Sequence, residues 1–171
     1  IERPGNRSFA VEHLPDISFD AHEDRREFVR QLFETRRLLE VPIIALAAER
    51  ANPLERDEIR AIAAGFTPDM GLREFRELDQ AFHAVIARAC GNPLLVEVYA
   101  KVMARLFQSE DIDRLLSSRA NRTEVRKIVD EAATQHAALA HAVAEGDVAM
   151  ATDEGTAHLA SVERGMIDRL V

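Results

Sequence analysis

The sequence predicts an all-α protein, an antiparallel bundle of six to seven helices around an internal metal and ligand cavity. Apolar residues recur at helical spacing along most of the chain, whereas no segment alternates apolar and polar residues for long enough to form a sheet. Proline, glycine and asparagine separate the periodic segments. The length of 171 residues and the 47% hydrophobic content are sufficient for one main domain with one substantial core.

The N-terminal third of the chain is expected to contain an arm and three helices. Residues 1–20 include two prolines and a glycine and should form an extended arm or linker. Proline fits the first turn of a helix and disrupts its interior, so Pro53 marks a helix start and Pro42 marks either a start or a kink. The expected helices span about 21–40, 42–51 and 53–64.

The rest of the chain is divided in the same way. Gly91, Asn92 and Pro93 end one helix and begin the next, polar residues 117–121 form a loop, and Gly146 with Asp147 separates the last two helices. The expected helices span about 71–90, 93–116, 122–145 and 147 to nearly 171.

Charge and cysteine content restrict the function of this piece. Its net charge of −8 opposes direct binding to DNA, because nucleic acid is held first by Lys and Arg. The single cysteine, Cys90, excludes an internal disulfide and fits a reducing compartment. No apolar run approaches the ~20 residues that cross a bilayer, so we expect a cytoplasmic protein without a membrane partner. The chain begins with Ile1, and we expect it to be a piece of a longer protein.

Four side chains are expected to meet at one divalent cation. Asp79 and His83 are four residues apart and share the apolar side of their helix. His136 lies in the middle of the apolar stripe of the sixth expected helix, and His158 lies beside the stripe of the seventh. Nitrogen and oxygen ligands from facing helices are typical of metal sites inside helical bundles.

Each of these residues also has a simpler interpretation. A single histidine on an apolar face is usually a core residue that bonds a carbonyl, and an inward aspartate is usually a cap or an ion-pair partner. The coincidence of one aspartate and three histidines on inward faces favours a metal site. The other histidines, His13, His22 and His141, are expected to be exposed and serve as an internal control.

Two arginines also fall on apolar faces. Arg36 lies in the middle of the stripe of the first helix, and a buried guanidinium requires a carboxylate. That carboxylate is either internal, from Glu40 or Asp79, or belongs to a bound ligand. Arg105 is a weaker candidate, because a long side chain near a helix end usually extends to solvent. A metal with one or two arginines would suit a small organic acid.

These motifs, in this order, resemble the C-terminal effector-binding domain, or FCD domain, of FadR-type transcription regulators in the GntR family. The resemblance implies that residues 21–171 form a helical domain for effector binding and dimerisation. It also implies a divalent metal, most simply Zn²⁺ with Ni²⁺ or Mn²⁺ as alternatives, and a carboxylate effector that approaches this metal and Arg36. The motifs that carry it are residues 34–40, 78–95, 135–136, 146–147 and 158–159.

The resemblance extends to the start of the chain, with two qualifications. Residues 3–11 are similar to the end of the wing of a GntR winged helix, although a tail with a chance glycine and phenylalanine is the alternative. Some FadR-type proteins lack the metal ligands and bind acyl-CoA, whereas all four ligands are present in this sequence, which argues against that branch. Cys90 stands where a small residue is usual, as a packing residue or a soft extra ligand.

The expected function is that of a ligand sensor. Binding of a small organic acid would change the affinity for DNA of a missing N-terminal winged helix-turn-helix domain. A symmetric operator would require a homodimer, with a self-complementary outer face possible on the first and fourth helices. The alternatives are a metal-dependent enzyme acting on a small organic acid and a purely structural dimerisation bundle. Turnover of candidate acids would favour the enzyme, and saturable binding without turnover would favour the sensor.

Overall fold

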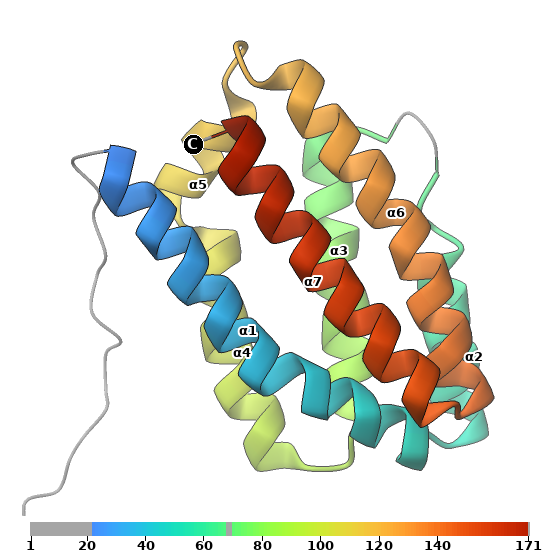
Figure 1. The fold of residues 1–171 in the computed structure, drawn as a ribbon. Helices are drawn as coiled ribbons and strands as arrows, with labels where there is room; N and C mark the ends of the chain where they lie inside the picture. Colours follow the sequence, from blue (N-terminus) through green and yellow to red (C-terminus); the bar gives the residue numbers. More distant parts are fainter. Residues whose placement is uncertain (1–21, 68–69, 171) are drawn as a thin grey trace, which may run out of the picture.

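The computed structural model describes residues 22–67 and 70–170, except for the side chains of residues 22–24, 105, 111 and 170 (Figure 1). Within these residues the chain is entirely helical with connecting turns, which confirms the all-α prediction. The expected arm, residues 1–20, lies outside the described residues, as does His13. The helices are α1 (His22–Arg50), α2 (Pro53–Ala63), α3 (Leu72–Ala89), α4 (Pro93–Gln108), α5 (Glu110–Ser117), α6 (Arg122–Glu145) and α7 (Val148–Leu170).

The first helix is longer than the sequence predicted. Pro42 lies inside α1 and does not begin a second helix, so the expected boundary there is wrong. Proline removes one backbone hydrogen bond, but the residues on both sides of Pro42 are held by packing. Phe33 precedes it and Ile43 and Ile44 follow it, and all three are at most 1% exposed. Burial on both sides of Pro42 outweighs the local preference for a break.

The fifth expected helix, by contrast, is two helices. Ser109 has an extended conformation, with φ −69° and ψ 115°, and it ends α4 and begins α5. Its hydroxyl oxygen accepts a hydrogen bond from the backbone N–H of Ile112 at 3.3 Å. Serine favours this N-cap position because its side chain replaces a missing helical partner. The expectation of one uninterrupted helix over 93–116 is therefore wrong.

The remaining boundaries follow the punctuation of the sequence. Asn52 caps α2 in a reciprocal arrangement with Glu55, and the side chain of Asn92 caps α4. Gly146 ends α6 in the left-handed region at φ 76°, and its amide bonds the carbonyls of the last turn. Each of these caps acts within a single turn of the chain, so the sequence alone is sufficient to predict these helix ends.

The helices form a bundle in which α7 packs along α1 on one side and along α6 on the other, as Figure 1 shows. Helix α1 also contacts α3, and α3 contacts α4 and α6. Gly155 permits the close approach of α7 to α1, because a Cβ atom there would lie 2.6 Å from Cδ1 of Ile44. Among the described residues, none of the helices is long and apolar enough to cross a membrane.

Candidate metal centre

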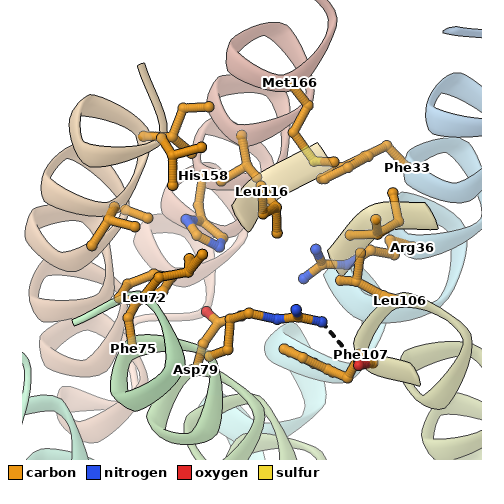
Figure 2. Close-up of a pocket in the computed structure, with 17 residues that line it drawn as sticks. Phe33, Arg36, Leu72, Phe75, Asp79, Leu106, Phe107, Leu116, His158 and Met166 are labelled. Carbon is orange, nitrogen blue, oxygen red and sulfur yellow. Dashed lines mark hydrogen bonds between the residues drawn. The ribbon is translucent and has the colours of Figure 1, made fainter. Parts of the chain in front are cut away.

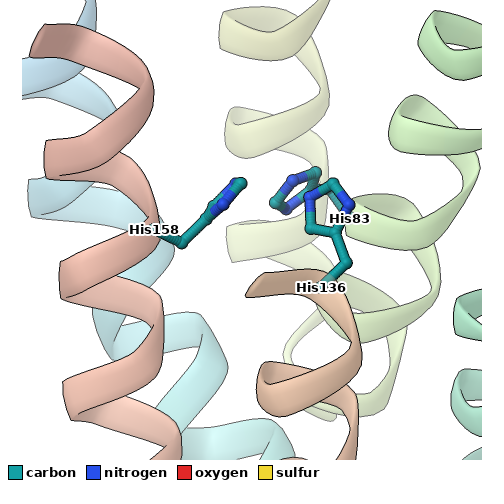
Figure 3. A group of neighbouring side chains, drawn as sticks. All are labelled: His83, His136 and His158. Carbon is teal, nitrogen blue, oxygen red and sulfur yellow. The ribbon is translucent and has the colours of Figure 1, made fainter. Parts of the chain in front are cut away.

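Three helices bring three histidines together in the interior of the bundle. His83 on α3, His136 on α6 and His158 on α7 are 3%, 0% and 2% exposed. One ring nitrogen from each lies within 4.8 Å of the others, and Figure 3 shows the rings gathered between their helices. His141, five residues after His136, is exposed, as expected of a control. The side chain of His22 is not described.

Asp79 adds an oxygen to this group. Its Oδ1 atom lies 3.1 Å from Nε2 of His136 and 3.4 Å from Nε2 of His83. One turn of α3 separates Asp79 from His83, so a regular helix is sufficient to place both on one side. The structure thus brings together the four side chains that the sequence predicted as ligands. Together they offer three ring nitrogens and one carboxylate oxygen at one point.

Two of the rings are oriented by neighbouring oxygen acceptors. Nδ1 of His83 lies 2.5 Å from Oε1 of Glu40, and Nδ1 of His158 lies 3.1 Å from Oε1 of Gln135. A carboxylate or amide oxygen only accepts, so Nδ1 carries the proton in each ring. In the neutral form of each ring, Nε2 then has the free lone pair, which is the usual arrangement of a metal-binding histidine and its hydrogen-bond partner.

Several nitrogens at the centre have no hydrogen-bond partner. They are Nε2 of His83 and both ring nitrogens of His136, whose approach to Asp79 is not aligned as a hydrogen bond. The ring of His136 is also surrounded by the rings of Phe66, Phe75 and Phe82. A buried polar atom without a protein partner is costly, and ring nitrogens of this kind are free to bind an ion or an ordered water.

The electrostatics of the centre largely favour the protonation states that a cation requires. Burial lowers the pKa of His136 and that of His158, which keeps both rings neutral. Burial alone would raise the pKa of Asp79, but contact with His136 and His83 holds it well below its usual range. Burial would lower the pKa of His83, yet the carboxylates of Glu40 and Asp79 raise it to about 9. A cation would therefore displace one proton from His83.

Arg36 has an internal partner. It is 2% exposed, and its Nε and Nη2 atoms each lie 3.0 Å from Oε2 of Glu40. Of the two internal partners that the sequence left open, the guanidinium bonds Glu40 and not Asp79. Burial would raise the pKa of Glu40, but Arg36 and His83 lower it strongly. Glu40 thus joins the buried arginine to a ring of the candidate metal centre.

A cavity of about 70 Å³ lies beside this centre. Asp79, His158 and Arg36 line it, and Figure 2 shows them around the same space. Most of its other lining residues are apolar, and the remaining charged one is Arg76. The side chain of Arg105, the second arginine candidate, lies outside the described part of the chain.

Sequence reasoning missed two contributors to the site. Arg76 is three residues before Asp79, so helical spacing could have placed both on the same face. Gln135 precedes His136 on α6 and bonds His158 on α7, and no local pattern reveals a contact between side chains on different helices. Glu40 was considered only as a partner for Arg36, whereas it also contacts His83.

The chain resembles characterised proteins over most of its length. The FCD domain model matches residues 31–161. The HTH-type transcriptional regulator LutR of Bacillus subtilis (strain 168) is 31% identical over 142 residues, which are 81% of this chain and 62% of LutR. The chain thus spans less than two thirds of the length of that relative.

Two solved structures share the fold. The metal-free FCD domain of TM0439 superposes with a TM-score of 0.64, and the Zn²⁺-bound form of the same domain with 0.63. Each is 25% identical in sequence, and each match covers 85% of this chain and 95% of the solved one. Because the family model matches more than half of the sequence and the helices adopt the corresponding fold, this chain belongs to the FCD domain family.

Proposed function

We propose that this chain is the sensor domain of a GntR-type transcription regulator, and that it binds a divalent metal together with a small organic acid. The observation that carries the proposal is the convergence of three buried histidine rings whose nitrogens lie within 4.8 Å of one another. Asp79 supplies a carboxylate oxygen at the same point. The relation to LutR, which is described as a transcriptional regulator, supports the regulatory part.

The donor set fits a divalent cation. Nε2 of His83, His136 and His158 would bind it together with Asp79, since three nitrogens and one oxygen are a common ligand set for zinc. The Zn²⁺-bound form of the related TM0439 domain supports Zn²⁺, with Ni²⁺ and Mn²⁺ as the alternatives. A bound cation would supply positive charge and open coordination positions for ligand oxygens.

The adjacent cavity suits a small acid with an apolar body. Its walls are mostly apolar, and the polar groups that line it are those of Asp79, His158 and the two arginines. Arg36 contributes a guanidinium to the wall while it is bound to Glu40. Arg105 remains a second proposed effector residue.

Regulation requires a connection between this site and DNA. A ligand that binds one arrangement of the helices better than another shifts their equilibrium, by a coupling free energy of about 1–3 kcal/mol in typical cases. In a complete regulator, an N-terminal winged helix-turn-helix domain would bind DNA, and a homodimer of these chains would match a symmetric operator. This chain would act on DNA through such a domain and not through its own surface.

The proposal is tested with the purified chain. We expect elemental analysis to find about one equivalent of a divalent metal per chain after exposure to zinc and removal of excess. Small carboxylic acids should then bind saturably without being converted, and a chelator should abolish their binding. Absence of bound metal from the wild-type chain, or turnover of an acid, would contradict the proposed function.

A further inference from the structure

The two arginines that line the cavity differ in how firmly they are already paired. Arg36 bonds Glu40, and both side chains are at most 3% exposed. Arg76 donates hydrogen bonds to the carboxylate of Asp113 at 2.6 Å and to the backbone carbonyl of Phe107 at 2.9 Å. The side chain of Asp113 is 63% exposed. The dashed line that ends at Phe107 in Figure 2 marks the second of these bonds.

This difference decides which arginine is able to change partners. Moving Arg36 away from Glu40 would leave a buried carboxylate without a counter-ion, which is strongly unfavourable. Moving Arg76 away from Asp113 costs little, because an ion pair with an exposed member contributes little and water can solvate the carboxylate. The carbonyl of Phe107 lies at the end of α4, where helical carbonyls commonly bond water.

We propose that Arg76 forms the ion pair with the carboxylate of the bound acid by exchanging Asp113 for it, while Arg36 stays on Glu40. This inference rests on the proposed function and assigns the residue that recognises the anionic group. Arg76 is on the same helix as Asp79, three residues away, so an acid held by it would lie next to the candidate metal centre. A planar guanidinium binds a carboxylate through two parallel hydrogen bonds, which adds orientation to attraction.

The exchange has a consequence for the fold. Phe107 and Asp113 lie on either side of Ser109, where α4 ends and α5 begins. Arg76 therefore ties α3 to both sides of this break in the absence of a ligand. When Arg76 turns to an acid, α5 loses that tie, and occupancy of the cavity becomes coupled to the position of α5.

The test measures binding of malonate to the zinc-loaded chain by NMR titration. Arg76→Gln should weaken binding about tenfold or more, since a charge-assisted pair is lost. Arg73→Gln removes the same charge from an exposed position of α3 and should change binding less than twofold. Asp113→Asn should strengthen binding by about two- to fivefold, because it removes the competing carboxylate.

The two variants are expected to change the affinity for malonate in opposite directions, which separates recognition of the acid from a structural role of Arg76. If Arg76 only held α5 in place, Arg76→Gln and Asp113→Asn would weaken binding together, and that result would overturn the inference. Equal affinity of Arg76→Gln and the wild type would overturn it too, while leaving the proposed function intact. If the zinc-loaded wild-type chain bound neither malonate nor any of the small carboxylic acids that test the proposed function, both would fail. Should Arg76→Gln not fold, Asp113→Asn decides alone: stronger binding of malonate supports the exchange, and equal or weaker binding overturns it.

Discussion

Nδ1 of His83 lies 2.5 Å from Oε1 of Glu40, so a carboxylate on α1 holds the ring of a candidate metal ligand on α3. The same carboxylate bonds Arg36, and all three side chains are at most 3% exposed. A buried pair of opposite charges is tolerated when each member finds several partners. Glu40 therefore has two roles, which are to neutralise Arg36 and to direct Nε2 of His83 toward the centre.

Glu40→Gln should lower both the stability of the protein and its affinity for metal. The amide oxygen can still accept from His83, but Arg36 is left buried without a counter-ion, which costs about 3–5 kcal/mol of stability. Loss of the carboxylate behind a metal-binding histidine typically weakens metal binding about 10–100-fold. Chemical denaturation of the metal-free protein measures the first effect, and a zinc competition titration measures the second.

The matched control is Glu58→Gln. Glu58 pairs with Arg88 at 2.8 Å, between side chains that are 48% and 54% exposed. An exposed pair contributes less than about 1 kcal/mol, and Arg88 is exposed on α3 whereas His83 of the same helix is buried. Equal losses of stability in the two variants would show that Glu40 has no special position in the core.

The stability of the metal-free protein should depend on pH through His83. Its pKa is raised to about 9 in the folded state, from 6.5. A raised pKa contributes stability that is complete below pH 6.5 and is lost as the pH rises through 9, a change of about 3 kcal/mol. Denaturation of the apo-protein between pH 6.5 and 9 measures the slope, which should be absent from His83→Gln. A wild-type curve that stays level across this window would contradict the prediction.

Most of the fold could be predicted from the sequence because its boundaries are set by local chemistry. Asn52, Asn92 and Gly146 act within their own turns, and the expected helix ends occur there. Pro42 and Ser109 led to errors for opposite reasons. Tertiary packing keeps α1 intact across Pro42, whereas the capping side chain of Ser109 interrupts a pattern that looked continuous.

The candidate site was predictable to the extent that it depends on which face of a helix a residue occupies. Asp79, His83, His136 and His158 lie inward because their positions match the apolar stripes, and helical geometry alone transmits that information. The contacts that orient them could not be predicted, because they join different helices. Glu40 reaches His83 from α1 and Gln135 reaches His158 from α6, and such contacts depend on the rotation and spacing of the packed helices.

His136→Ala should lower metal content and the benefit of metal to stability together. A ligand that binds only the folded state stabilises it by mass action, by about 2.7 kcal/mol at a free concentration 100 times its dissociation constant. We therefore expect zinc to raise the unfolding midpoint of the wild type and to have little effect on the variant. His141→Ala, at an exposed position of the same helix, should behave like the wild type. Unchanged zinc content in His136→Ala would remove this residue from the ligand set.

The contact between Gly155 and Ile44 predicts how the helix that carries His158 is positioned. A Cβ atom at residue 155 would lie 2.6 Å from Cδ1 of Ile44, so Gly155→Ala should displace the buried Ile44 side chain or α7 itself. The overpacking should cost about 1–3 kcal/mol, of which the better helix propensity of alanine offsets up to about 1 kcal/mol. Ile44→Val removes that Cδ1 atom, and the double variant should recover part of the loss, with a coupling of at least about 0.5 kcal/mol. His158 is three residues beyond Gly155, so the single variant should also bind zinc more weakly than the double variant. Additive losses of stability and equal zinc affinities would show that this close approach does not position His158.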